Sequence, residues 1–312
     1  AAPLAGRDPA GVAGIDAVVE ALDRGLCADP ELAGLPGRFL FAVDDGTGAV
    51  DSLPADVQLT AERDGERCVD GERCVDGEPH ADGEPHVFRL WLDGSATSVA
   101  VAAERAPAAA LRAARGFLAL RLQGADSAWR VRELEGGAER LARHLGLELL
   151  ERPSAVARRR GLGLHIQRDG LFAVAVLPPL ARLDGAQLTR LAELARGLGS
   201  GAENDACVRV SPWRTLTFVD VPASVALRLL GELQGIGLIA SDASGWSGLS
   251  ACAGMGACSK ARADVRAAAA ERALVREPSS PLEHWSGCER RCGEPADAGV
   301  RFVATEHGMV TL

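Results

Sequence analysis

The chain contains no tyrosine and only one lysine, Lys260, in 312 residues. It also has no run of the about 18 apolar residues that a membrane-spanning helix requires. The first residues, "AAPLAGRDPAGVAG", do not place an apolar core after a basic region, so they do not resemble a signal peptide. These absences predict a soluble cytoplasmic protein that does not act in or on a membrane.

Basic residues are too few to suggest a nucleic-acid partner, because the net charge is −9 and phosphate contacts need a clustered basic surface. A few local arginines could still bind an anionic small molecule. The chain has eight cysteines. Without a secretory signal, cysteines more often serve metal binding or catalysis than disulfides.

The sequence divides into three predicted domains, at residues 1–155, 160–240 and 241–312. The first begins with a predicted helix that Asp16 caps and Gly25 ends. Strands are predicted in "GRFLFAVDDGTGAV", "DVQLTAE" and "HVFRLWLDG", the last two forming a hairpin, followed by amphipathic helices in "APAAALRAARGFLALRLQ" and "GGAERLARHLGLELL".

A six-residue repeat, "DGERCVDGERCVDGEPHADGEPH", separates the two hairpin strands at residues 64–86. It places Cys68, Cys74, His80 and His86 in register, which raises the possibility of a metal chelate. Asp, Gly, Glu and Pro dominate the repeat, as in a solvated turn, and hairpin loops tolerate added length. We therefore favour a tandem duplication within a loop.

Residues 160–240 show the clearest periodicity, two strands and a helix followed by two more strands and another helix. This ββαββα order predicts a small α+β sandwich with its helices on one face of a sheet. The predicted fold class of the chain is therefore α+β.

Four cysteines gather in the last segment, with Cys252 and Cys258 six apart and Cys288 and Cys292 four apart. Structural zinc usually takes closer pairs, whereas an iron–sulfur cluster is a larger object that takes one thiolate on each iron. Gly254 and Gly256 would let the backbone fold around it, and a helix predicted from Ser259 would point its positive end at it. Zinc and buried core cysteines remain alternatives.

The motif C-x5-C followed by C-x3-C, ending in "SGCERRCG", resembles the cluster motif of the sirohaem sulfite and nitrite reductase superfamily. The ββαββα segment resembles its ferredoxin-like half-domain, "VRVSPWRTLTF" its anion-binding strand pair, and "LPGRFLFAVDDG" its "LPRKFK" segment. The resemblance implies four thiolate ligands to a [4Fe–4S] cluster. It also implies a nitrite/sulfite reductase-like fold in which residues 1–155 form a cluster-like domain without the cysteine motif, and in which a preceding half-domain is missing.

Two members of the superfamily fit. The reductases carry sirohaem bridged to the cluster through the last cysteine, here Cys292. Precorrin-3B synthase uses dioxygen, the cluster and a separate non-haem iron to hydroxylate precorrin-3A in aerobic cobalamin biosynthesis. The resemblance implies an anionic tetrapyrrole substrate, dioxygen and an electron donor, NADH-linked or ferredoxin-like, that the sequence does not identify.

The "LPRKFK" segment favours the second member. Its two lysines, which hold the small oxyanion in reductases, correspond here to Arg38 and Leu40. Six-electron reduction needs protons delivered to a developing anion, so the loss of one donor is costly. The shorter chain points the same way. We therefore predict precorrin-3B synthase-type monooxygenase activity, with a sirohaem reductase fragment or a non-catalytic cluster- or tetrapyrrole-binding remnant as alternatives.

Other charged residues are candidates for substrate binding. Arg209 and Arg214 are predicted on adjacent strands, where guanidinium groups could bind the substrate's carboxylates, and Lys260 follows Cys258. Each could instead be a solvated charge, Lys260 in the first turn of a helix. Trp213 and Trp285 could stack on a macrocycle or simply pack. No histidine has a partner at ligand spacing, so the ligands of a mononuclear iron are not assigned.

Overall fold

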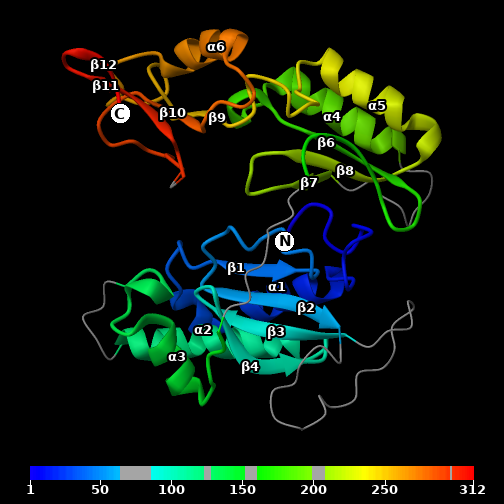
Figure 1. Ribbon diagram of the computed structural model, residues 1–312, viewed down its shortest axis with the longest axis vertical. Helices are drawn as coiled ribbons and strands as arrows, with labels where there is room; N and C mark the ends of the chain where they lie inside the picture. The colour runs from blue at the N-terminus through cyan, green and yellow to red at the C-terminus, as the bar shows by residue number, and fades with distance from the viewer. Residues whose placement is uncertain (64–85, 123–127, 152–159, 199–207, 296) are drawn as a thin grey trace. The chain divides into compact units, whose positions relative to one another are not determined.

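The structure is a computed structural model that describes residues 1–63, 86–122, 128–151, 160–198, 208–295 and 297–312 (Figure 1). Contacts within the chain define two compact units, residues 1–160 and residues 161–312. The sequence-based division into three domains stays a prediction. Among the described residues, no helix has the length and apolar character of a membrane span.

The first unit is built on a four-stranded sheet in the order β1-β2-β3-β4. The first two strands are parallel and the other neighbours are antiparallel, so β2 and β3 form the predicted hairpin. The chain reverses between β3 and β4 at Asp93 and Gly94, which both have positive φ, as the tightest hairpin turns require. The strands are β1 (Phe41–Asp44), β2 (Val57–Arg63), β3 (His86–Leu92) and β4 (Ser95–Val101).

Helix α2 packs against β2 and β3, and α1 and α3 pack against α2. Nine residues of α2 are buried, including Phe117, which is fully enclosed. The helical elements are α1 (Asp16–Ala28), η1 (Pro30–Gly34), α2 (Ala106–Leu122), η2 (Val131–Glu133) and α3 (Gly137–Leu145).

The prediction that Gly25 ends the first helix is wrong, because α1 continues to Ala28. A Cβ atom at Gly25 would lie 2.5 Å from Cδ1 of Leu111 on α2. The glycine therefore serves the close approach of two helices rather than a helix end. Asp16 is the first residue of α1, and no side chain caps the helix.

The second unit begins with the predicted ββαββα arrangement, an antiparallel sheet in the order β5-β6-β8-β7. Figure 1 shows α4 and α5 on the same side of this sheet. The elements are β5 (Gly163–Ile166), β6 (Phe172–Val176), η3 (Pro179–Ala181), α4 (Gly185–Leu198), β7 (Val208–Val210), β8 (Leu216–Val221) and α5 (Ala223–Gly235).

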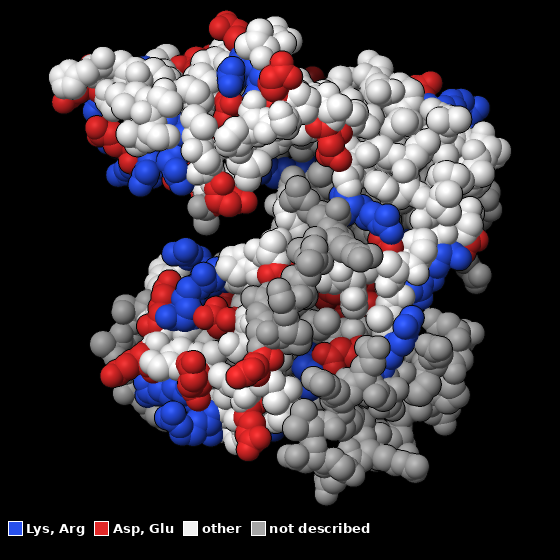
Figure 2. Space-filling model, in the orientation of Figure 1, with Lys and Arg blue, Asp and Glu red and all other residues white. Residues whose placement is uncertain are grey.

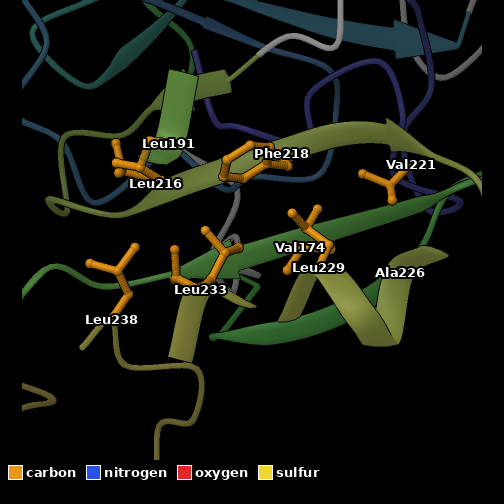
Figure 3. Close-up of a cluster of buried hydrophobic side chains, with 10 residues drawn as sticks. Val174, Leu191, Leu216, Phe218, Val221, Ala226, Leu229, Leu233 and Leu238 are labelled. Carbon is orange, nitrogen blue, oxygen red and sulfur yellow. The ribbon is translucent and has the colours of Figure 1, made fainter. Parts of the chain in front are cut away.

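Apolar side chains from both helices and the two central strands form the core of this sandwich (Figure 3). Phe218 on β8 lies at its centre, and Val174, Leu229 and Leu233 are also buried. Alternation along β6 and β8 places these side chains on the face that the helices cover. The hydrophobic periodicity of the sequence thus has its physical origin in this core.

The cysteine motifs belong to the last part of the second unit, which forms a second four-stranded sheet in the order β12-β11-β10-β9. Strands β9, β10 and β11 are parallel, and β12 returns antiparallel along the edge. Helix α6 packs against β9 and β10. The elements are β9 (Leu249–Ala251), α6 (Val265–Val275), β10 (Glu283–Ser286), β11 (Val300–Thr305) and β12 (Gly308–Thr311).

The prediction that a helix starts near Ser259 is also wrong. Helix α6 begins at Val265, and the side chain of Asp264 caps it by accepting from the backbone N–H of Ala267 at 3.1 Å. Aspartate at this position satisfies one of the free N–H groups of the first turn. Residues between the first cysteine pair and Asp264 form turns instead.

Charges of both signs are interspersed on the face of the molecule seen in Figure 2. The net charge of −9 therefore does not gather into one acidic surface among the described residues of this face.

Candidate functional site

The two cysteine pairs follow neighbouring parallel strands. Cys252 comes directly after β9, and Cys288 follows β10 by two residues. Ala251 is paired with Trp285 in the register of these strands. Because parallel strands end at the same edge of a sheet, the topology brings both motifs to one edge, although 29 residues separate them in the sequence.

Backbone hydrogen bonds join the two cysteine loops. The N–H of Cys252 donates to the carbonyl of Trp285 at 2.9 Å, and the N–H of Arg262 donates to the carbonyl of Gly287 at 2.7 Å. The N–H of Gly287 donates to Sγ of Cys252 at 3.1 Å. The thiol of Cys252 is therefore hydrogen-bonded to the loop that carries Cys288 and Cys292.

Glycine is required at residue 287 because the loops approach closely there. A Cβ atom would lie 2.9 Å from Cβ of Ala261 and 3.5 Å from Sγ of Cys252. Gly254 has a φ of +68°, and its carbonyl accepts from the N–H of Cys258 at 3.0 Å, which closes the first loop. The expectation that glycines shape this loop agrees with the structure at Gly254.

All four of these cysteines are free thiols. Cys252, Cys258 and Cys288 are half-buried, and Cys292 is exposed. Within the described part of the chain, no three His, Cys, Asp or Glu side chains are grouped closely enough to hold one metal ion. The donor set consists of four thiols on two loops that glycines shape, and thiolates are ligands of both zinc and iron–sulfur clusters.

Arg214 lies in the tight turn between β7 and β8, not on a strand as predicted. Ser211 builds this turn: its carbonyl accepts from the N–H of Arg214 at 3.0 Å, and its Oγ accepts from the N–H of Thr215 at 3.1 Å. Arg214 has a φ of +68°, a conformation that non-glycine residues rarely adopt. A backbone held in this way fixes where the guanidinium leaves the turn.

The guanidinium of Arg214 is half-buried, and burial lowers its pKa. Among the described residues it has no hydrogen bond or ion pair that would offset this cost. Its positive charge also lowers the pKa of His284 on β10. A desolvated and uncompensated cation is suited to bind an anion.

His284, four residues before Cys288, is a residue to which the sequence analysis assigned no role. It is 1% exposed on β10, and its Nδ1 lies 2.8 Å from Oγ of Ser250, its register partner on β9. Burial lowers the pKa of His284, and the charge of Arg214 lowers it further, against raising effects from the Cys292 backbone and Glu294. The ring is therefore neutral near pH 7.

The other cations predicted to bind substrate are half-buried or exposed. Arg209 is half-buried on β7 opposite Thr217. Lys260 is exposed in the turn after Cys258, so its alternative placement in the first turn of a helix is wrong. Arg38 is exposed in the first unit, in the segment that precedes β1. The described contacts bring together the two cysteine loops, and the strands that precede them are joined by the Ser250–His284 hydrogen bond.

Trp285 is engaged in packing. Its ring stacks on Phe302 of β11, with centroids 4.0 Å apart and planes inclined by 16°. The repeat residues Cys68, Cys74 and His80 lie outside the described residues, as does Cys207. His86 is buried as the first residue of β3 and has an edge-to-face contact with Phe88.

Comparison with known proteins agrees with this architecture. Residues 165–236 match the nitrite/sulfite reductase ferredoxin-like half domain. The Mycobacterium tuberculosis NirA protein has a similar structure, with a TM-score of 0.70 and 20% sequence identity over 99% of this chain and 59% of that one. The present chain thus spans about 59% of the length of NirA. No curated protein matches the sequence.

These findings define the fold. The chain has the α+β architecture of the nitrite and sulfite reductases, as predicted, and contains their ferredoxin-like half-domain. The family match concerns residues 165–236, and the structural match concerns the fold of the chain. Dissimilatory sulfite reductase I matches over 44% of this chain at 14% identity with a TM-score of 0.34, which is too low to carry an argument.

Proposed function

We propose that this chain is an oxidoreductase that carries a [4Fe–4S] cluster on Cys252, Cys258, Cys288 and Cys292 and acts on a tetrapyrrole. The observation that carries the proposal is the N–H of Gly287 donating to Sγ of Cys252 across the two cysteine loops. Hydrogen bonds to cysteine sulfur are one of the means by which proteins set the potential of such clusters. When bound, the cluster would supply one-electron transfer.

The substrate we propose is precorrin-3A, hydroxylated as in precorrin-3B synthase. A polycarboxylate tetrapyrrole would meet the half-buried guanidinium of Arg214, with Arg209 and Lys260 of the same unit as further cations, and Arg38 of the first unit stays a separate candidate. Guanidinium groups bind carboxylates through two parallel hydrogen bonds. Leu40, which stands where the reductase segment has a lysine, supports this reading over reduction of a small oxyanion.

The proposed hydroxylation consumes one molecule of dioxygen for each precorrin-3A. One oxygen atom of dioxygen enters the substrate and the other leaves as water. Two electrons come from a reductant, either NADH-linked or ferredoxin-like, and the protons that this reductant does not carry come from solvent. The resemblance also implies a separate non-haem iron, and no group of described side chains is arranged to hold a single ion.

A second candidate is a sirohaem-dependent nitrite or sulfite reductase. The half-domain match and the similarity to NirA favour it as much as the first candidate, because both would use the same fold. In that case the tetrapyrrole would be a cofactor instead of a substrate. The cysteine ligands would be unchanged.

The cluster is tested by iron and acid-labile sulfide analysis after anaerobic purification. Wild type should contain about four of each per chain, and Cys288→Ser should lose most of both. Cys27→Ser is the matched control, because Cys27 is an exposed thiol of the first unit. Retention of the full content in Cys288→Ser would contradict the proposal.

The two candidates are separated by absorption and by turnover. A precorrin-3B synthase should show only the broad absorption of a cluster, and should convert precorrin-3A with consumption of dioxygen when a reductant is present. Intense sirohaem bands together with reduction of sulfite or nitrite would favour the second candidate. A cluster without turnover of either kind would indicate a non-catalytic binding protein.

A further inference from the structure

The first cysteine loop, residues 252–258, is attached to the start of helix α6. The N–H of Met255 donates to the carbonyl of Ala263 at 3.1 Å. Gly254 lies so close to the helix that a Cβ atom there would be 3.2 Å from Cγ2 of Val265, the first residue of α6. Val265 is fully buried. The first turn of α6 therefore packs against this loop.

Arg266, the second residue of α6, makes a further contact with the loop. Its Nε donates to the backbone carbonyl of Cys252 at 3.3 Å. The aliphatic part of the side chain also lies beside the loop, because a Cβ atom at Gly254 would be 3.8 Å from Cγ of Arg266. The side chain is half-buried. The guanidinium is therefore held next to the residue that carries the first thiol.

The hydrogen bond from Arg266 completes the restraint of Cys252. The N–H of this cysteine donates to the carbonyl of Trp285, and its Sγ accepts from the N–H of Gly287. With Arg266 on the carbonyl, the three polar groups of Cys252 are bonded to strand β10, to the second cysteine loop and to α6. Of these three partners, Arg266 is the one that brings a charge.

The position of Arg266 is unfavourable for a cation within the helix itself. The N-terminal end of a helix carries partial positive charge, which favours acidic residues there and disfavours basic ones. The first turn of α6, all of which the structure describes, contains no acidic residue. Among the described residues, no carboxylate forms an ion pair with Arg266. An anionic group bound beside Cys252 would account for a cation at this place.

We propose that Arg266 is a positioning residue for the [4Fe–4S] cluster, which fixes the carbonyl of Cys252 through Nε and stabilises the negative charge of the cluster. The inference rests on the proposed function, because it requires the four thiols to bind a cluster. Net charge and hydrogen bonds around the sulfurs set the reduction potential of such clusters. Reduction adds one negative charge, so the guanidinium favours the reduced form and raises the potential.

The reduction potential of the anaerobically reconstituted cluster tests the role of the charge. Arg266→Met removes the cation and should favour the oxidised form about tenfold, which lowers the potential by about 59 mV for one electron. Arg266→Lys keeps the charge and should stay close to wild type. A titration followed by electron paramagnetic resonance gives the three potentials. A wild-type potential in Arg266→Met would overturn the inference.

The rate at which a chelator removes iron without air tests the role of the hydrogen bond. Arg266→Gln places an N–H donor at the same number of bonds from the backbone as Nε, but without the charge. It should lose iron at nearly the wild-type rate, whereas Arg266→Met should lose iron about tenfold faster. The potential of Arg266→Gln should fall as in Arg266→Met. Equal rates of iron loss in these two variants would contradict the positioning role.

Arg262→Met is the matched control. Arg262 is an exposed cation between the same loop and α6, and its bond to the carbonyl of Gly287 comes from the backbone, which the substitution leaves in place. Solvent and salt screen an exposed charge, so both the potential and the rate should stay near wild type. If Arg266→Met behaves like Arg262→Met, the inference is overturned and the proposed cluster stands. If wild type takes up no iron and sulfide, the proposed function fails and the inference falls with it.

Arg266→Glu separates a role at the cluster from a role in the fold. Glutamate is favoured in the first turn of a helix, so the metal-free full chain of this variant should unfold at no lower urea concentration than wild type. The same variant should retain less iron than Arg266→Met, because it brings a negative charge to the cluster. A metal-free Arg266→Glu chain that is clearly less stable than wild type would show that the arginine serves the fold, and would overturn the inference.

Discussion

Arg276 and Glu283 form an ion pair in the interior of the cysteine-bearing sheet, with Nε 3.1 Å from Oε1 and side chains that are 0% and 2% exposed. Arg272 pairs with the same carboxylate at 2.9 Å. Arg276 also donates to the carbonyls of Gly245, Ser247, Ser280 and Pro281. One arginine therefore ties the end of α6 to the loops that flank β9 and β10.

Loss of this carboxylate should destabilise the second unit. Glu283→Gln leaves the buried guanidinium of Arg276 without its counter-charge, and breaking a buried pair in this way typically costs 3–5 kcal/mol. We expect the free energy of unfolding, measured in urea, to fall by about 3 kcal/mol. Glu232→Gln is the control, because the Arg190–Glu232 pair is exposed and should contribute little to stability.

Substitution of Gly287 should separate the two cysteine loops. In Gly287→Ala the new methyl group would meet Cβ of Ala261 at 2.9 Å, so the backbone must shift and the hydrogen bond to Sγ of Cys252 should lengthen. We expect a several-fold lower iron content after reconstitution. Gly185→Ala, at the start of α4 where a Cβ atom meets nothing within 4 Å, should match wild type. Equal iron content in both variants would contradict this account.

Arg214 should lower the free energy of unfolding and strengthen the binding of a tetrapyrrole. Asparagine tolerates positive φ better than arginine and brings no charge to be desolvated, so Arg214→Asn should raise the free energy of unfolding by about 1 kcal/mol. The same variant should bind an eight-carboxylate porphyrin such as uroporphyrin about tenfold more weakly, as fluorescence quenching would show. Unchanged affinity together with higher stability would indicate that the arginine does not contact the tetrapyrrole.

Asp29 makes a contribution to stability that depends on pH. Its carboxylate accepts from Nε of Arg115 at 2.7 Å, and this hydrogen bond holds the pKa of Asp29 below its ordinary value. Because the folded pKa lies below the unfolded one, the contribution is complete above about pH 4 and is lost as the pH falls through the folded pKa. The difference in unfolding free energy between wild type and Asp29→Asn should therefore shrink in acid. A difference that stays constant from pH 7 to pH 3 would contradict this, and Glu20→Gln is an exposed control.

The ββαββα segment could be predicted from the sequence because its periodicity reflects a single local core. Strands β9 and β10 could not, because each is short and flanked by glycine-rich turns, and their pairing joins residues more than 30 positions apart. The start of α6 was misplaced since the turn after Lys260 carries helix-forming residues. Asp264, the true cap, was present in the sequence but was outweighed by them.

The candidate site, like the fold, could be predicted from the sequence only in part. The spacing of the four cysteines is a sequence property and identified them as a set, whereas the cluster itself stays a prediction. The hydrogen bond of His284 could not be predicted, because Ser250 becomes its partner only through the register of two strands. The exposed state of Arg38 and Lys260 likewise depends on tertiary packing.

The pairing of β9 with β10 has a consequence for how such proteins can diverge. The distance between the two thiol-bearing loops is set by neighbouring strands and not by the intervening stretch that holds α6. Insertions or deletions in that stretch can accumulate while the ligand geometry stays the same. A search for related chains should therefore hold the spacing inside each cysteine pair constant and let the gap between the pairs vary freely.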